Sequence, residues 1–254
     1  MQKSLFDLTG KRAIVVGGAG EIGYAIAEAL LEFGASVVIV DKDTDTPVKV
    51  RELNKIWPNC FGLIFDITDR DEIDESLVLA VGLLDGPVEV LVNAAGIQRR
   101  YPSEIFPEKD WDEVISVNLT SVFLYSKKVS QDMIRNGYGK IINVSSIMSQ
   151  FGGVNIPAYA ASKGGVSQLT KAMSNDLSGR GIRINAISPG YISTSMNQAI
   201  LQNSERTASI LKRTPVGRWG MPTDLQGIAV FLASNASDFI TGAVIPVDGG
   251  YSGM

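Results

Sequence analysis

Short, almost wholly apolar segments alternate with stretches of helical spacing along this chain. Strands with so few polar residues must be buried on both faces, and strict alternation with helices is typical of a parallel sheet. The seven predicted strands are Arg12–Val16, Ser36–Asp41, Cys60–Phe65, Val88–Asn93, Lys140–Val144, Arg183–Ile187 and Ala243–Val247. The predicted helices are Tyr24–Phe33, Val48–Trp57, Asp71–Leu83, Asp110–Arg135, one that carries Tyr159 and Lys163, pieces between Ser195 and Lys212, and Pro222–Ala233.

No linker or low-complexity segment separates these elements. We therefore predict an α/β fold: a single doubly wound Rossmann-type domain over residues 1–254, with a parallel seven-stranded sheet and helices on both faces. An apolar content of 45% and a charged content of 20% fit a globular protein with a sizeable core.

A glycine-rich turn, Gly18-x-Gly20-x-x-Gly23, lies between the first predicted strand and the first predicted helix. Glycines at this spacing permit a tight turn and close backbone approach to a pyrophosphate, which the helix N-terminus attracts. A purely structural turn is the alternative. The place of the motif in the first strand–helix–strand unit favours dinucleotide binding.

Asp41 ends the second predicted strand, eighteen residues after Gly23. A carboxylate at this place accepts hydrogen bonds from the hydroxyls of an adenosine ribose and repels a 2′-phosphate. The sequence therefore predicts NAD(H) rather than NADP(H), although Lys42 beside Asp41 could soften that preference. A solvated aspartate at a strand end is the alternative interpretation.

Tyr159 and Lys163 are four residues apart, so on a helix they lie on one face, one turn from each other. Ser146 follows the strand-like run Lys140–Val144. The ordinary pKa of a tyrosine is about 10, and a fixed ammonium nearby lowers it, which lets the phenol exchange a proton with an alcohol or a carbonyl. Ser146 would hold the same substrate oxygen. By itself Tyr-x-x-x-Lys is a weak signal that also arises by accident.

The chain contains no histidine and one cysteine. It therefore has neither a Ser-His-Asp triad nor a histidine or thiolate metal cluster, and we predict no metal site. Acid–base chemistry must fall to Tyr, Lys, Asp or Glu. The lone Cys60 lies in a strand-like run and is expected to be a small buried apolar residue.

A net charge of −4 gives no electrostatic footprint for nucleic acid. Residues Met1–Gly10 include Lys3 and Asp7 and lack the apolar stretch of a signal peptide. Uncharged segments such as Ile141–Ser162 are broken by Asn, Ser, Gly and Pro and are not membrane spans. We expect a cytoplasmic location, with neither membrane nor nucleic acid as a partner.

Several motifs follow one another along the chain, and their order is more informative than any one of them alone. Residues Val16–Gly23 match a Thr-Gly-x-x-x-Gly-x-Gly loop at Gly17 and Gly23, whereas Val16 replaces the threonine and Glu21 the middle glycine. Asn93-Ala94-Ala95-Gly96 follows the fourth strand, and Ser146, Tyr159 and Lys163 come later. Together these motifs resemble the short-chain dehydrogenase/reductase family over essentially the whole chain. The departure at Glu21 puts a carboxylate near the expected pyrophosphate, from which it should point away.

The resemblance implies an enzyme, an oxidoreductase acting on CH–OH donors, in which a hydride moves between a secondary alcohol carbon and nicotinamide C4. Tyr159 would exchange the proton, and Lys163 would lower its pKa and bond the ribose. Ser146 would polarise the substrate oxygen, and Asn118 would hold a proton-relay water. The resemblance also implies that Asp66 contacts the adenine and that segment 189–194 holds the nicotinamide. The implied cofactor-binding residues are Gly17, Gly20, Glu21, Ile22, Gly23, Asp41, Asp66, Ile67, Asn93, Ala94, Gly96, Tyr159, Lys163, Pro189, Gly190, Ile192 and Thr194.

Arg99 and Arg100 follow the fourth strand, on the side where ligands bind in open α/β sheets. Their forked donors suit a carboxylate, although a solvated basic pair is an equal alternative on the residues alone. The runs Gly96–Arg100, Trp111–Asn118 and Arg213–Gly220 resemble the sugar-acid dehydrogenases of the family, of the gluconate 5-dehydrogenase and 2-dehydro-3-deoxygluconate dehydrogenase type. The resemblance implies a C6 sugar acid as substrate, with contacts from Arg99, Arg100, Ser146, Gln150 and Tyr191.

Alternatives stay open: another carbonyl substrate, such as a 3-oxoacyl thioester or a polyol, or a non-catalytic dinucleotide sensor, which the intact Ser146, Tyr159 and Lys163 disfavour. The stretch from Ser193 to about Leu211 is the expected lid. The resemblance also implies a homotetramer. One sheet face cannot bury every apolar residue of the predicted helix Asp110–Arg135, so we expect an outer apolar side among Val114, Val117, Leu119, Val122, Phe123 and Val129.

Overall fold

The computed structural model describes residues 4–254, so Lys3 and the two residues before it, which belong to the segment Met1–Gly10, lie outside the described part. Within residues 4–254, seven strands form one sheet in the order β3-β2-β1-β4-β5-β6-β7, and every neighbouring pair is parallel. The strands are β1 (Arg12–Val16), β2 (Ser36–Asp41), β3 (Cys60–Ile64), β4 (Val90–Asn93), β5 (Gly139–Val144), β6 (Ile182–Pro189) and β7 (Val244–Val247).

Helices connect successive strands. The α-helices of the described residues are α1 (Glu21–Glu32), α2 (Thr46–Asn54), α3 (Arg70–Leu83), α4 (Glu108–Ile115), α5 (Ser121–Asn136), α6 (Met148–Phe151), α7 (Pro157–Leu177), α8 (Gln198–Leu201), α9 (Ser204–Lys212) and α10 (Gln226–Ala233). Short 3₁₀ turns are η1 (Ser103–Ile105), η3 (Ser178–Arg180), η4 (Ser195–Asn197), η5 (Pro222–Leu225), η6 (Asn235–Ser237) and η7 (Tyr251–Gly253). A π-helical turn, η2 (Ser116–Thr120), joins α4 to α5.

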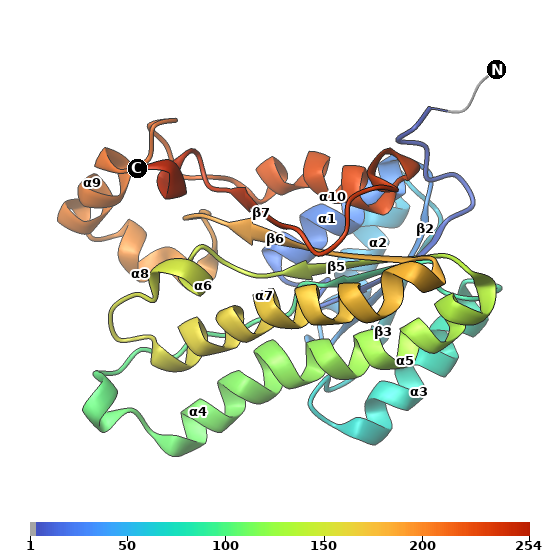
Figure 1. Cartoon of the computed structure of the whole chain (residues 1–254), viewed down its shortest axis with the longest axis horizontal. Coiled ribbons are helices and arrows are strands. Elements are labelled where there is room, and N and C mark those ends of the chain that lie inside the picture. Colours follow the sequence, from blue (N-terminus) through green and yellow to red (C-terminus); the bar gives the residue numbers. More distant parts are fainter. Residues whose placement is uncertain (1–3) are drawn as a thin grey trace.

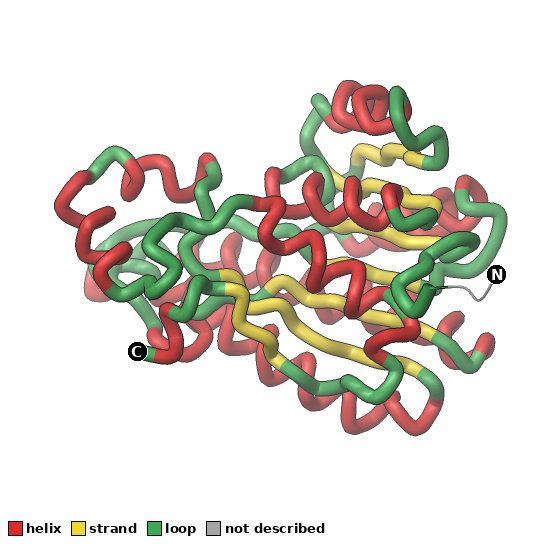
Figure 2. The backbone as a smooth tube through the Cα atoms, turned by 90° about the horizontal axis from the view of Figure 1, so that it is seen from above, coloured by secondary structure: helices red, strands yellow, loops and turns green. Residues whose placement is uncertain are grey.

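Helices cover both faces of the sheet: α3, α5 and α7 on one face, and α1, α2 and α10 on the other (Figures 1 and 2). Successive residues of a strand point to opposite faces, so each strand supplies two cores. Ala13 and Val15 of β1 belong to the α1 side, whereas Ile14 and Val16 belong to the α5 side. The predicted doubly wound parallel sheet is confirmed, and both of its faces are buried.

Several local predictions are also confirmed. Strands β1 and β2 have the predicted bounds. Gly34 follows the end of α1 with a φ of +99°, a conformation that glycine adopts without strain. Cys60 is 1% exposed, and burial raises its pKa to about 12. Within residues 4–254 no helix is both long and apolar enough to span a bilayer.

The expected outer apolar side of the helix after Asp110 is largely wrong. Val114, Val117, Val122 and Val129 are buried within the chain itself, at 0%, 6%, 3% and 4% exposed, because the π-helical turn and α5 pack against α3 and α7 as well as the sheet. Of the six residues named for that side, Phe123 is the one that stays substantially exposed, at 42%.

The turn between η3 and β6 provides a test of the backbone packing. Gly181 has a φ of +88°, and a Cβ added there would lie 2.1 Å from the carbonyl oxygen of Gly137. We expect Gly181→Ala to lower the free energy of unfolding by about 2 kcal/mol or more, measured by urea denaturation. Gly179→Ala is the matched control, because a Cβ there meets no atom within 4 Å. Equal effects of the two substitutions would contradict this packing argument.

Candidate active site

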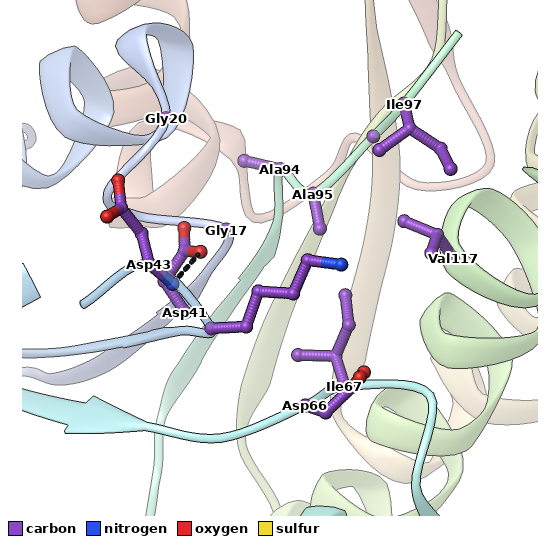
Figure 3. A pocket seen from close by; sticks show the side chains of 12 residues that line it. Gly17, Gly20, Asp41, Asp43, Asp66, Ile67, Ala94, Ala95, Ile97 and Val117 are labelled. Carbon is purple, nitrogen blue, oxygen red and sulfur yellow. Dashed lines mark hydrogen bonds between the residues drawn. The ribbon is translucent and has the colours of Figure 1, made fainter. Parts of the chain in front are cut away.

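Two adjoining hollows open at the carboxyl ends of the strands and share Gly20, Ala94 and Gly96. The first, of about 690 Å³, lies between the glycine loop and the ends of β2 and β3, beside Ile97 and Val117 (Figure 3). The second, of about 820 Å³, lies between the start of α1, the end of β5 and the segment after β6. Of the predicted cofactor-binding residues, all within the described part of the chain, Asn93 alone lines neither hollow.

The glycine loop is packed too closely for a side chain at Gly17, Gly18 and Gly23. A Cβ on Gly17 would lie 2.4 Å from Ala95 N, and one on Gly23 would lie 2.1 Å from Gly17 O. The loop turns directly into α1, whose N-cap residue, Gly20, has no side chain to bond the free N–H groups of the first turn. Such a cradle of backbone N–H groups at a helix N-terminus fits the pyrophosphate of a dinucleotide.

Asp41 lies at the edge of the first hollow (Figure 3). Its carboxylate accepts hydrogen bonds from the backbone N–H of Ala19, at 3.0 Å, and of Asp43, at 3.1 Å, which fix its orientation beside the glycine loop. Lys42 lines the same hollow. The edge of the hollow thus carries both an anchored carboxylate and an ammonium.

Asp66 lines the first hollow from the other side, with its carboxylate turned to its own loop. One oxygen accepts from Thr68 N and Thr68 Oγ1, at 2.8 and 2.7 Å. Burial alone would raise the pKa of Asp66, but these two bonds and the charge of Lys42 lower it below its ordinary value. The carboxylate is therefore held ionised and in one orientation.

Asn93 lies in the interior rather than at the hollows. Its amide donates to Asn143 Oδ1 at 2.8 Å and to Ser126 Oγ at 3.1 Å, and Asn143 donates to Thr170 Oγ1 at 2.9 Å. The alternation of a strand explains this placement, because the last residue of β4 faces α5 while Ala94 lines the hollows. Sequence reasoning missed Asn143, whose only signal was a polar residue inside an apolar strand.

Ser146, Tyr159 and Lys163 all line the second hollow. Lys163 Nζ donates to the carbonyl oxygen of Val144 at 2.8 Å, and Ser145 Oγ donates back to the Lys163 carbonyl at 3.1 Å, so α7 is tied to the end of β5. Ser146 Oγ accepts from Met148 N at 3.1 Å, which holds the hydroxyl in the turn after β5. The strand and the helix therefore deliver their side chains to one place, as the sequence predicted.

The pKa of Tyr159 differs from the sequence prediction, which was a lowered value. Burial raises the pKa of Tyr159 above its ordinary value, and a hydrogen bond with Ser146 and the charge of Arg100 offset this only in part. The ammonium of Lys163 is turned to the carbonyl oxygen of Val144 and lies 5.8 Å from the centre of the Tyr159 ring. Burial also lowers the pKa of Lys163 itself to about 8.

Asn118 lies in the π-helical turn between α4 and α5, a type of helix irregularity that is frequent at functional sites. Its carboxamide donates to Ile97 O at 2.9 Å, accepts from Ile97 N at 2.8 Å, and donates to Ser162 Oγ at 3.1 Å. These bonds join the segment after β4 to α7. Asn118 therefore holds the backbone that leads to the two arginines.

Arg99 and Arg100 have different surroundings. Arg99 donates to both carboxylate oxygens of Glu113 on α4, at 2.9 and 3.1 Å. Arg100 has no carboxylate within ion-pair distance among residues 4–254, and its charge acts on Tyr159 and Tyr191. Burial lowers the pKa of Arg100, and the charge of Arg206 on α9 lowers it further. Sequence reasoning missed Arg206, whose signal was a basic residue within the expected lid.

Tyr191 and Gln150, the other two predicted substrate contacts, also have surroundings other than those predicted. The ring of Tyr191 packs edge-on against Trp219 and Tyr251, with centroids 5.4 Å away in each case. Tyr251, near the C-terminus, was not predicted. Gln150 is an exposed residue of α6 and lines neither hollow.

Comparisons with known proteins agree with this geometry. The family profile described as "Enoyl-(Acyl carrier protein) reductase" matches residues 17–252. The 5-keto-D-gluconate 5-reductase of Escherichia coli (strain K12) is 42% identical to this chain over 247 residues, which are 97% of each protein. The 2-dehydro-3-deoxy-D-gluconate 5-dehydrogenase of Bacillus subtilis (strain 168) is 40% identical over 250 residues, 97% of this chain and 96% of that protein.

A crystal structure of a gluconate 5-dehydrogenase from Burkholderia cenocepacia, in complex with NADP and tartrate, matches the fold with a TM-score of 0.93. It is 37% identical, and the match covers 98% of each chain. Because the profile and these relatives span nearly the whole sequence, the chain belongs to the short-chain dehydrogenase/reductase family.

Proposed function

We propose that this chain is an NAD(H)-dependent oxidoreductase that interconverts a secondary alcohol and a ketone of a C6 sugar acid. The observation that carries the proposal is the convergence of Ser146, Tyr159 and Lys163 on one hollow, next to the segment Pro189–Thr194. Relatives of similar length that are named for gluconate and 2-dehydro-3-deoxygluconate chemistry support the substrate class. One dinucleotide-binding unit over the whole chain is part of the proposal.

A bound nicotinamide dinucleotide would supply or accept the hydride. Because the pKa of Tyr159 is raised above its ordinary value, the phenol is protonated at neutral pH and is ready to donate to a ketone oxygen. In the reverse direction the same oxygen takes the proton back from the alcohol. Ser146 holds the reacting oxygen against the phenol, and Lys163 fixes the helix that carries Tyr159.

The role of Tyr159 can be tested by removing its hydroxyl alone. We expect Tyr159→Phe to lower kcat by about a hundredfold to ten-thousandfold, since one acid–base group contributes that much, while NADH still binds with similar affinity by fluorescence titration. Tyr138→Phe is the control, because Tyr138 precedes β5, at the amino ends of the strands and away from the hollows at their carboxyl ends. Retained turnover in Tyr159→Phe would rule out this tyrosine as the proton donor.

The preference for NAD(H) rests on the anchored carboxylate of Asp41 at the first hollow. The Burkholderia relative holds NADP, so this preference would be a property of the present chain. A ribose hydroxyl can donate to a carboxylate, whereas a 2′-phosphate would meet like charge. Lys42 in the same hollow would reduce that repulsion.

Asp41→Ala should narrow the ratio of kcat/KM for NAD to that for NADP by about tenfold, because it removes a like charge from the site of the 2′-phosphate. Steady-state kinetics with both cofactors measure the ratio. Asp43→Ala is the matched control, since Asp43 also lines the first hollow but is paired with Lys49 at 2.8 Å. A wild-type protein that uses both cofactors equally would be inconsistent with this assignment.

The sugar-acid part of the proposal rests on Arg100. Its guanidinium acts on the catalytic Tyr159 and has no carboxylate partner among residues 4–254, whereas Arg99 is held by Glu113. A substrate carboxylate would supply the missing partner through charge-assisted hydrogen bonds. Of the two arginines predicted from the sequence, Arg100 is therefore our candidate for the substrate contact.

We expect Arg100→Ala to lower kcat/KM for the sugar acid by about thirtyfold, as befits the loss of one charge-assisted pair, and to change turnover of the matching neutral polyol much less. Arg99→Ala is the matched control and should have a small effect with either substrate, because its charge is already paired. The carboxylate assignment fails if Arg100→Ala leaves acid turnover intact, or if neutral polyols are the better wild-type substrates.

We also propose a cytoplasmic homotetramer, on the basis of the family resemblance. Two exposed apolar side chains support it: Phe123 on α5 is 42% exposed, and Phe239, shortly before β7, is fully exposed. Light scattering at micromolar concentration should give about four times the chain mass of 27.2 kDa. A monomer under those conditions would contradict this part of the proposal.

A further inference from the structure

Glu21 stands where the glycine-rich loop of the family has its middle glycine, and it makes a contact that a glycine could not. It is the first residue of α1 and lines the second hollow. Its Oε2 accepts hydrogen bonds from Ser195 N at 2.7 Å and from Ser195 Oγ at 2.8 Å. One carboxylate oxygen thus joins two segments that are 174 residues apart in the sequence.

Ser195 lies near the start of the segment that we call the lid, residues 193–220. Both ends of the lid meet at one point: Ser193 N donates to Gly220 O at 2.8 Å, and Gly220 N donates to Tyr191 O at 2.9 Å. Between these ends the chain forms η4, α8 and α9, which project beyond the carboxyl ends of the strands (Figure 1). The lid is therefore an excursion closed at its base, the geometry expected of a hinged cover.

Few hydrogen bonds join the first part of this lid to the body of the protein, although Ile200 and Ile210 within it are buried. Within residues 4–254, Glu21 is the only residue outside residues 191–220 that hydrogen-bonds to residues 195–212. Glu21 and Ser195 are both exposed and both line the second hollow, so the bridge spans the solvent-facing edge of that hollow. Breaking it would free the start of the lid while the base stayed closed.

We propose that Glu21 is a latch that holds the lid over the second hollow and so slows the release of the dinucleotide. The retention part of this proposal rests on the function proposed above. The carboxylate is a positioning group that acts through Ser195. Glutamate also suits the first turn of a helix, where it interacts favourably with the positive end of the helix dipole. Because the carboxylate is turned to the lid, the N–H groups at the start of α1 stay free for a diphosphate.

Two variants separate the latch from the charge. Glu21→Ala and Glu21→Gln both remove a negative charge next to the expected diphosphate, which by itself would slow release. Only the glutamine keeps an oxygen that can accept the two Ser195 bonds. The ratio of the two NADH release rates, measured by stopped-flow fluorescence, therefore isolates the latch. We expect release from Glu21→Ala to be about fivefold faster than from Glu21→Gln, a modest factor because the bonds are exposed.

Hydrogen exchange on the protein without cofactor gives a second measurement. In Glu21→Ala, amides of residues 195–212 should exchange about fivefold faster than in the wild type, with Glu21→Gln close to the wild type and the sheet unchanged. Glu32→Gln is the matched control, since Glu32 ends the same helix, is exposed, and has no hydrogen-bonded or ionic partner among residues 4–254. It should change neither the exchange nor the release.

The outcomes separate this inference from the proposed function. Equal NADH release from Glu21→Ala and Glu21→Gln, or lid exchange in Glu21→Ala at the wild-type rate, would overturn the latch while leaving the enzyme assignment intact. A wild-type protein that binds no NADH would overturn the proposed function and the retention role. The exchange of residues 195–212 would then still decide whether Glu21 holds the lid.

Discussion

One buried hydrogen bond, from Lys163 Nζ to the carbonyl oxygen of Val144, fixes the geometry on which the site depends. Lys163 is 3% exposed, and an ammonium removed from water must find a partner or give up its proton. The carbonyl at the end of β5 supplies that partner. Ser146 leaves the strand two residues later, and Tyr159 lies one turn before Lys163 on α7. The bond that satisfies the lysine therefore also brings the hydroxyl and the phenol to the same hollow.

A polar network behind the sheet supports this contact. Asn93 at the end of β4 bonds Asn143 in β5, which bonds Thr170 on α7, and Asn93 also bonds Ser126 on α5. Buried amides need such partners, and these bonds satisfy the amide nitrogen of Asn93, whereas its Oδ1 is buried without a partner among residues 4–254. The two strand ends that border the hollows are thus held to each other and to both neighbouring helices. Asn93, expected to touch the cofactor, contributes by holding the strand ends in place.

The sequence predicts best where the physical signal is periodic or local. Apolar strands, the glycine loop and the spacing of Tyr159 and Lys163 all lead to the observed sheet and hollow. Contacts between distant segments leave no such signal. Adjacent arginines in a loop look alike, and only the fold shows that Arg99 meets Glu113 while Arg100 faces the tyrosines. Spacing predicts that Tyr159 and Lys163 share one face of a helix, but it does not show that the Lys163 ammonium bonds the carbonyl oxygen of Val144.

The two hollows also differ in charge, although the chain as a whole carries only −4. Asp41, Asp43 and Asp66 line the first beside one ammonium, Lys42, whereas the charge of Arg100 acts on Tyr159 at the second. Charges of one sign gathered on a partly enclosed surface create a local field that net charge does not reveal. Under the proposed function, Asp41 at the first hollow faces the ribose hydroxyls of the dinucleotide, and Arg100 faces the carboxylate of the separate sugar-acid substrate.

Glu21 lines the second hollow next to Gly20, which lines both hollows, and a free carboxylate there would oppose a diphosphate. Its pairing with Ser195 turns that charge toward the lid, so the substitution that departs most from the glycine loop of the family is compatible with cofactor binding. At Gly17 and Gly23 an added Cβ would meet backbone atoms, whereas the side chain at position 21 leaves the loop and reaches Ser195. Tight packing therefore explains why Gly17 and Gly23 are kept, and position 21 is where the chain gains a contact to its lid.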